Sequence, residues 1–367
     1  MKKALSLAQK GLFTTTANPR VGCVLVSRGH IVGKGYHKRV GEPHAEVFAI
    51  ENADEFAQGA TAFVTLEPCS HFGKNPPCAD ALIKAKVKKV ILCNKDPNPL
   101  VAGKGIEKLK AAGIKVKMSS ETRKGEQLNI GFFHRMKTGL PFVRLKMAQS
   151  LDGRTAMENG ESYWITGKKA RADVQYWRAR SQAILTGIET VLQDDCQLRV
   201  RVDELPKKYR KLPNDFDNYQ PMRVVLDTHL RINFDAKILQ GLGRKVIMTA
   251  SLNFEKIKQL ESQGVDVVPM PTVNGVIDLN AVLVWLGKQQ INELLVETGA
   301  TLAGNFINQK LVDQLIIYTA PVIMGSFARP LFELEIDSMK DSIRFKNYQL
   351  KKIGKDLRYL INFPQSV

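Results

Sequence analysis

Four residues in the first quarter of the chain have the chemistry of a metal-dependent active site. His44, Cys69 and Cys78 carry an imidazole and two thiols, the ligands that zinc prefers. Three protein ligands leave one tetrahedral position open, as in catalytic rather than structural zinc sites. Glu46 follows His44 by two residues and would place a carboxylate beside the metal without binding it. The sequence therefore predicts a catalytic zinc site.

This predicted site suits hydrolytic deamination. Zinc lowers the pKa of a bound water toward about 7, and Glu46 would take its proton while the oxygen attacks an amine-bearing ring carbon. Glu46 would then protonate the departing amine. The pattern H-x-E…P-C-x-x-C is typical of zinc deaminases, but here eight residues, "SHFGKNPP", separate the cysteines. A closed structural site with His71 as fourth ligand is the alternative, although it would have no use for Glu46.

Two predicted helix starts must position these side chains. Residues two apart on a regular helix point about 200° apart, so His44 and Glu46 converge only if the metal lies beyond the first turn. Pro43 favours a helix start at that point. Cys78 follows Pro77 and begins a second helical pattern, whose N-terminus favours a thiolate.

The first 140 residues alternate helical and strand-like patterns. Arg28-Gly29 reads as a hairpin turn between two strands. The alternation predicts βαβ units and a largely parallel sheet with covered faces. The other predicted strands span 61–68, 88–94 and 114–118, and the helices span 4–13, 44–57, 78–86, 105–113 and 128–141.

A second alternating series starts after Gly139 and Pro141. With 367 residues, the chain exceeds the usual single-domain length. We therefore expect two domains, 1–140 and 141–367. The segment Arg201–Gln220 is rich in charge, proline and asparagine and is predicted to be a surface loop.

Composition restricts the partners and the compartment. The net charge is +18, but the basic residues are scattered, which favours a surface that attracts anionic metabolites over a nucleic-acid partner. Five cysteines form a poor disulfide framework, and no apolar run approaches the roughly 20 residues of a membrane span. We expect a cytoplasmic protein without a membrane partner.

Several ordered motifs resemble the family of bifunctional riboflavin-biosynthesis deaminase/reductases. They are "NPRVGCV", "GYHKRVGEPHAEV", "EPCSHFGKNPPC", "DPNPLVAGKG", "SLDGRTA", "GESYWITG", "ILTGIETVLQDDCQLRVR" and "VETGATLAG". The resemblance implies an N-terminal cytidine-deaminase-like three-layer αβα domain that deaminates a diamino-hydroxy-phosphoribosylamino-pyrimidine. It also implies a C-terminal dihydrofolate-reductase-like α/β domain that uses NADPH to reduce the ribosyl group to ribityl. A homo-oligomer is expected.

The resemblance also implies roles for residues of the first domain. His44, Cys69 and Cys78 would hold one Zn²⁺, and Glu46 would carry the proton. The pyrimidine would lie against Asn18, His37 and His71, and Lys74 in the insert would meet the substrate phosphate.

In the second domain, "LLVETGATLAGNF" reads as a strand ending at Glu297, a tight turn at Gly299 and a helix from Thr301. A helix N-terminus of this kind binds phosphate through its free N–H groups. By resemblance, the NADPH phosphate cradle would be Gly299, Ala300, Thr301, Leu302, Ala303, Gly304 and Asn305.

Other residues of the second domain fall on ligand-binding positions of the family. Arg178 and Arg201 suit a phosphate, because guanidinium groups form paired hydrogen bonds with its oxygens. Lys146 shares a strand face with Ala148. Asp152 is predicted to hold a turn. The implied cofactor contacts are Ala148, Trp164, Thr190 and Asp194, and the substrate contacts are Lys146, Ser162, Arg178, Leu198, Arg201 and Glu297.

Two other functions are compatible with parts of the sequence. A deaminase acting on tRNA would use the positive charge, but it would lack the eight-residue insert and would carry P-C-x-x-C. A zinc-stabilised binding protein without activity would not need Glu46.

Overall fold

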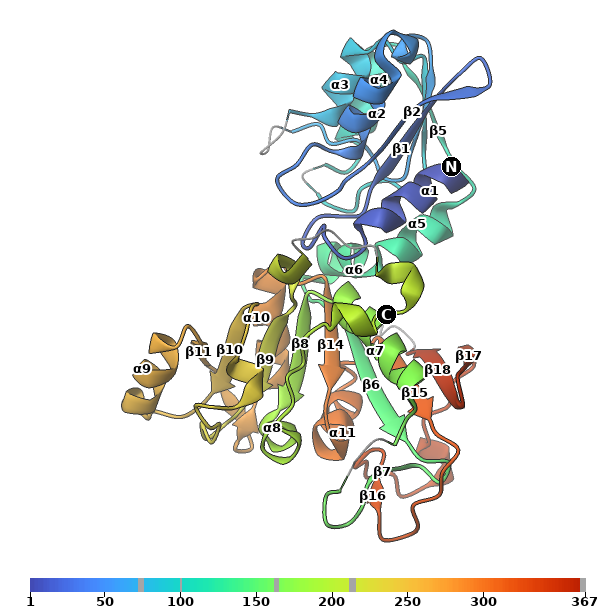
Figure 1. Ribbon diagram of the computed structural model, residues 1–367. Coiled ribbons are helices and arrows are strands. Elements are labelled where there is room, and N and C mark those ends of the chain that lie inside the picture. Colours follow the sequence, from blue (N-terminus) through green and yellow to red (C-terminus); the bar gives the residue numbers. More distant parts are fainter. Residues whose placement is uncertain (72–75, 100, 162–164, 211–215, 364–367) are drawn as a thin grey trace. The chain divides into compact units, whose positions relative to one another are not determined.

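The computed structural model describes residues 1–71, 76–99, 101–161, 165–210 and 216–363. The chain forms two compact units, Met1–Leu140 and Pro141–Val367. Figure 1 shows both. No helix in these described ranges is long and apolar enough to cross a membrane.

The first unit is built on a five-stranded sheet of order β2-β1-β3-β4-β5. β1 is antiparallel to both β2 and β3, whereas β3, β4 and β5 are parallel, so the predicted largely parallel sheet is a mixed one. The predicted hairpin is confirmed, because Arg28 and Gly29 have φ of 49° and 82°, as a two-residue turn requires. The strands are β1 Gly22–Ser27, β2 His30–Tyr36, β3 Thr61–Val64, β4 Lys89–Leu92 and β5 Lys115–Met118.

Helices cover both faces of this sheet (Figure 1). Alternate residues of β1 point to opposite sides: Cys23 and Leu25 pack with α2, and Val24 packs with α1. This arrangement confirms a three-layer unit. Its helices are α1 Lys2–Ala8, α2 Ala45–Ala53, α3 Cys78–Lys84, α4 Lys104–Ala111, α5 Thr122–Leu128 and α6 Ile130–Thr138, with short 3-10 turns η1 Gln9–Gly11 and η2 Asp54–Ala57.

The helix predicted over 128–141 is confirmed as α6, which starts at Ile130. The preceding helix α5, which ends at Leu128, was not predicted, and Asn129 separates the two helices. The predicted stop is confirmed, because Gly139 follows α6 with φ of 77°, a left-handed conformation that favours glycine.

The second unit contains a nine-stranded sheet of order β11-β10-β9-β8-β14-β6-β15-β18-β17. Its first seven strands are parallel, and β18 and β17 continue it in antiparallel fashion. The strands are β6 Phe142–Gln149, β8 Ala183–Gly187, β9 Met222–Leu226, β10 Lys245–Thr249, β11 Asp266–Pro269, β14 Glu293–Glu297, β15 Gln314–Thr319, β17 Tyr348–Ile353 and β18 Asp356–Asn362.

Five helices and two small ribbons complete the described part of this unit. β7 (Arg154–Ala156) pairs with β16 (Arg329–Pro330), and β12 (Thr272–Val273) pairs with β13 (Val276–Ile277). The helices are α7 Lys168–Arg180, α8 Ile188–Asp194, α9 Phe254–Ser262, α10 Leu279–Lys288 and α11 Ala300–Asn308, with 3-10 turns η6 Lys237–Leu239 and η7 Met339–Asp341.

The segment predicted as a surface loop, Arg201–Gln220, is more ordered than expected. Its described part holds three 3-10 turns, η3 Val202–Glu204, η4 Lys207–Tyr209 and η5 Phe216–Tyr219. Leu205 and Phe216 are buried, so apolar side chains attach the segment to the core.

Candidate functional site

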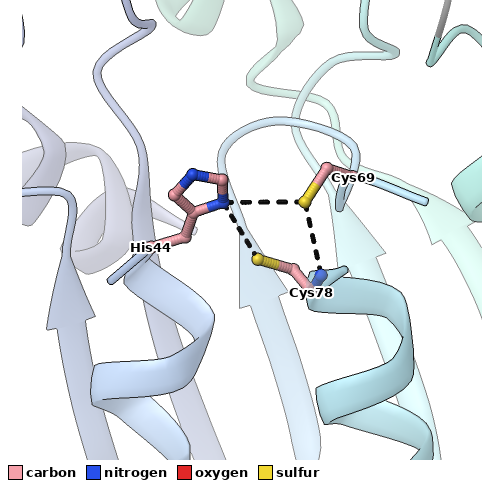
Figure 2. Close-up of side chains that lie close together, drawn as sticks. All are labelled: His44, Cys69 and Cys78. Carbon is pink, nitrogen blue, oxygen red and sulfur yellow. Dashed lines mark hydrogen bonds between the residues drawn. The ribbon is translucent and has the colours of Figure 1, made fainter. Parts of the chain in front are cut away.

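Two helix N-termini bring the predicted metal ligands together (Figure 2). His44 precedes α2 with an extended backbone, and Cys78 is the first residue of α3. Cys69 lies in the connection after β3. The His44 Nδ1 atom is 3.2 Å from Cys78 Sγ and 3.6 Å from Cys69 Sγ.

This donor set fits a zinc ion. With Zn–S bonds of about 2.3 Å and a Zn–N bond of about 2.1 Å, tetrahedral ligand atoms lie about 3.6–3.8 Å apart. The observed separations differ from that by a few tenths of an ångström. Among the described residues, His71 is not part of the cluster and its side chain is exposed, so the closed four-ligand alternative has no support.

The two thiols share one negative charge in the protein alone. The hydrogen bond with Cys78 lowers the pKa of Cys69 to about 4, against the effect of burial and with help from His44. The same hydrogen bond and burial raise the pKa of Cys78. The first amide of α3 also donates to Cys69 Sγ over 3.3 Å. Metal binding would release the remaining thiol proton, because zinc binds thiolates.

Glu46 lies inside this site. It is the second residue of α2, and only 3% of its surface is exposed. Burial raises the pKa of its carboxyl to about 7, although His44 opposes the shift. A carboxyl with a pKa near neutrality can both accept and return a proton at physiological pH.

Of the predicted pyrimidine contacts, two lie together beside the metal ligands. The His37 ring meets the His44 ring edge-on, with centroids 5.3 Å apart. Asn18 Nδ2 is 3.1 Å from His37 Nε2. Burial lowers the pKa of His37, which favours its neutral form. Lys74 lies outside the described residues.

Sequence reasoning missed two buried acids near Cys69. The Glu67 carboxylate accepts hydrogen bonds from the backbone N–H groups of Asp96, Gly103 and Ile106 over 3.2, 3.0 and 3.1 Å. It thereby fixes the loop that carries Cys69. Asp96 is also buried, and burial raises its pKa to about 6. An acid directly before Pro68-Cys69 was the only sequence signal for this support.

The second unit has a cavity of about 730 Å³ at the carboxyl ends of β6, β8, β9 and β14. Parallel sheets bind ligands at this edge. Most of the predicted ligand-binding residues line it: Lys146, Ala148, Arg178, Thr190, Asp194, Leu198, Arg201, Glu297, Gly299, Ala300, Thr301, Leu302 and Asn305.

Four predicted residues are not placed at the cavity. Ser162 and Trp164 lie outside the described residues. Ala303 and Gly304 are buried on α11 and do not line the cavity, and a Cβ on Gly304 would meet the backbone of Glu333. Sequence reasoning also missed Thr228, which follows β9 and lines the cavity.

A buried charge cluster forms one wall of the cavity. Glu297 accepts hydrogen bonds from Arg178 Nε and Nη2 over 2.6 and 3.0 Å, and Lys146 Nζ lies 3.5 Å from its carboxylate. Burial raises the pKa of Glu297, but Arg178 and Lys146 outweigh it and lower the pKa to about 2. The cluster therefore stays ionised and fixes both cations at the cavity.

The turn before α11 differs from its prediction. The helix begins at Ala300, not Thr301, and Gly299 has φ of −82°, which any residue adopts. The turn does not require glycine. A Cβ on Gly299 would meet no atom within 4 Å, and the residue lines the cavity. The missing side chain leaves room beside the free amides of the helix.

Asp152 holds a turn, as predicted. Its carboxylate accepts hydrogen bonds from Ser150 Oγ and from the amides of Met324 and Gly325, at 2.8 Å for Gly325. It joins the turn after β6 to the loop after β15.

The two units carry the fold and the candidate sites of a bifunctional deaminase/reductase. Residues 1–94 match the family model described as the cytidine and deoxycytidylate deaminase zinc-binding region, and residues 141–359 match the RibD C-terminal domain. The chain belongs to the RibD family of riboflavin-biosynthesis proteins, which are bifunctional deaminase/reductases.

Individual relatives resemble the whole chain. The riboflavin biosynthesis protein RibD of Escherichia coli (strain K12) is 48% identical, over 97% of this chain and 96% of that protein. The RibD of Haemophilus influenzae is 46% identical, over 98% and 95%. A solved structure of Acinetobacter baumannii RibD superposes with a TM-score of 0.91 at 45% identity, covering 99% of this chain and 98% of that one.

The name of a further solved structure includes both a deaminase and a reductase activity. The Thermotoga maritima protein, a diaminohydroxyphosphoribosylaminopyrimidine deaminase/5-amino-6-(5-phosphoribosylamino)uracil reductase, superposes with a TM-score of 0.84 at 30% identity, covering 99% and 97%. The predicted fold class and bifunctional activity in riboflavin biosynthesis are confirmed. These relatives do not favour the tRNA-deaminase alternative.

Proposed function

We propose that residues 1–140 deaminate 2,5-diamino-6-(5-phosphoribosylamino)pyrimidin-4-one and that residues 141–367 then reduce the product's ribosyl group to ribityl with NADPH. The substrates are those that the name of the Thermotoga maritima relative implies. The observation that carries the proposal is the cluster of three zinc-compatible ligands, His44, Cys69 and Cys78, with the buried carboxyl of Glu46 two residues after His44.

In the deaminase, His44, Cys69 and Cys78 would hold the zinc, which supplies a water of lowered pKa. Glu46 would accept a proton from the attacking water and return it to the leaving amine, so that the carbon–nitrogen bond breaks and ammonia leaves. Asn18 and His37 would orient the pyrimidine with His71 near it, and Lys74 would meet the substrate phosphate.

Replacing Cys78 with serine should remove zinc and ammonia release together. A neutral hydroxyl replaces one of the two thiolates, and zinc prefers the softer ligand. Zinc content per chain, measured by elemental analysis after dialysis, checks this. Cys93→Ser is the matched control, because Cys93 is buried in the same unit but its thiol donates to the Glu121 carbonyl and it is not part of the metal-ligand cluster. Equal zinc in both variants would contradict the assignment.

In the reductase, the first amides of α11 and the space at Gly299 would receive a cofactor phosphate. NADPH supplies the hydride when it is bound. Ala148, Thr190 and Asp194 line the cofactor side, with Trp164 proposed there. Arg178, held by Glu297, would bind the substrate phosphate with Arg201, and Lys146, Leu198 and Ser162 would complete the substrate side.

Gly299→Ala is expected to raise the KM for NADPH by about tenfold without changing thermal stability. The new methyl group meets no protein atom, so it would occupy space left for the phosphate. Gly304→Ala on the same helix should behave in the opposite way. Its Cβ would lie 2.1 Å from the Glu333 carbonyl oxygen, so stability should fall. NADPH titrations and thermal melts of both variants check the pair, and an unchanged KM in Gly299→Ala would contradict the cradle.

The two activities can be tested separately with their own substrates. The deaminated 5-amino-6-(5-phosphoribosylamino)uracil, supplied to the zinc-free protein, should support NADPH oxidation without ammonia release. If zinc removal stopped that oxidation while the second unit stayed folded, the assignment of one activity to each unit would fail.

Thiolate ligation suits a reducing compartment, and we propose that the protein acts in the cytoplasm. A homo-oligomer stays a prediction. The +18 charge is proposed to attract phosphorylated metabolites rather than nucleic acid, in which case RNA should not inhibit deamination at physiological salt.

A further inference from the structure

A side-chain amide far along the chain holds the backbone of Arg20. The Arg20 N–H donates to Asn129 Oδ1 over 2.8 Å, and Asn129 Nδ2 donates to the Arg20 carbonyl over 3.0 Å. Asn129 therefore pairs with both backbone groups of Arg20, as a neighbouring strand would. Both residues are buried, with 1% of Asn129 and 4% of Arg20 exposed.

The Arg20 side chain forms further hydrogen bonds, one of them to the residue next to Asn129. Its guanidinium donates to the carbonyls of Leu128 and Leu12 over 3.1 and 3.3 Å. Leu128 ends α5, so the break between α5 and α6 provides both the Leu128 carbonyl and the Asn129 side chain. The residues between α5 and α6 therefore hydrogen-bond with Arg20, in the segment that precedes β1.

That segment leads into the deaminase site. Asn18, two residues before Arg20, places its Nδ2 atom 3.1 Å from His37 Nε2. The backbone N–H of His37 donates to the carbonyl of Val21, the residue after Arg20, over 2.9 Å. The His37 ring in turn meets His44. The positions of Asn18 and His37 therefore depend on the backbone path through Arg20.

We propose that Asn129 is a positioning residue of the deaminase, which fixes Arg20 so that Asn18 and His37 face the substrate. This inference rests on the proposed deamination. It also assigns a role to the segment after residue 94, where the match to the deaminase family model ends. The α5–α6 break would then be part of the active-site architecture rather than a connection alone.

A positioning role and a purely stabilising role for Asn129 predict different kinetics. If loss of the amide lets the Asn18 loop leave its binding-competent path, apparent affinity falls in proportion to the competent fraction. KM for the diaminopyrimidine should then rise, by about tenfold, while kcat changes little because His44, Glu46 and the cysteines are untouched. A residue that only stabilised the fold would reduce the active fraction, lowering apparent kcat at constant KM.

The test compares Asn129→Ala with Phe132→Leu in the full zinc-loaded chain. Phe132 is buried on α6, one turn from Asn129, so its truncation loosens the same helix but leaves the hydrogen bonds of Arg20 with Asn129 and Leu128 in place. Zinc content and NADPH oxidation on the deaminated substrate report whether each variant is folded. We expect the KM increase in Asn129→Ala only.

Asn129→Asp serves if the alanine variant does not fold. It keeps the volume and the acceptor for the Arg20 N–H but loses the donor to the Arg20 carbonyl, so KM should again rise. An unchanged KM in the folded variants, or an equal rise in Phe132→Leu, would overturn the inference. If the wild-type chain released no ammonia, the proposed function itself would fail, which is a distinguishable result.

Discussion

Glu46→Gln is expected to lower ammonia release by about 10²–10⁴-fold, the usual contribution of a general acid–base group. Glutamine has nearly the volume of glutamate but cannot take the proton of the water or return it to the amine. The residue is not a metal ligand, so zinc content should stay at the wild-type level. NADPH oxidation on the deaminated substrate should also be unchanged, because the reduction belongs to the second unit.

The same helix provides a matched control for this variant. Glu51 lies on α2 with an exposed side chain, so Glu51→Gln removes the same charge from the same element without touching the site. Its ammonia release should equal that of the wild type. A zinc-loaded Glu46→Gln protein that kept most of the wild-type rate would show that another group carries the proton.

Glu293→Gln is expected to destabilise the second unit by about 3–5 kcal/mol, the usual effect of breaking a buried ion pair. Glu293 begins β14, is fully buried, and accepts hydrogen bonds from Arg144 and from Arg180, the latter over 2.6 Å. Burial already lowers the pKa of Arg144 to about 10, which shows the cost of holding its charge there. Removing the carboxylate would leave two buried guanidinium groups without a counter-charge.

Unfolding by denaturant, followed by tryptophan fluorescence, measures this effect. Trp164, Trp177 and Trp285 are the three tryptophans of the chain, and all belong to the second unit. Asp266→Asn is the control, because the Arg244–Asp266 pair is exposed and such pairs contribute less than about 1 kcal/mol. Similar midpoints for the two variants would refute the buried cluster's role.

The cluster of His44, Cys69 and Cys78 could be predicted from sequence because its signals are local. Pro43 and Pro77 mark the starts of two helices. The helix period lets His44 and Glu46 face the same point only at a helix start, and in the structure His44 directly precedes α2. Most strands and helices of the first unit were readable from the same local patterns, although α5 was missed.

Features that depend on distant pairings were not predictable. Three contacts join segments whose local sequences do not indicate their partners. They are the antiparallel pairing of β1 with β3, the hydrogen bond of Asn129 with Arg20, and the ribbon of β7 with β16. The phosphate cradle shows a different limit. A run of seven motif residues was assigned together, but a helix turns, so Ala303 and Gly304 face the core.

The central claim is that one chain carries two active sites that act in order. The most direct measurement supplies the phosphoribosylamino diaminopyrimidine to the zinc-loaded protein with NADPH and follows ammonia release and NADPH oxidation in parallel. We predict that ammonia appears first and that NADPH oxidation follows after a lag. Glu46→Gln should lower both by about 10²–10⁴-fold. Adding the deaminated compound should then restore NADPH oxidation but not ammonia release. NADPH oxidation without prior ammonia release would contradict the order, and zinc-loaded protein that releases no ammonia would contradict the deaminase itself.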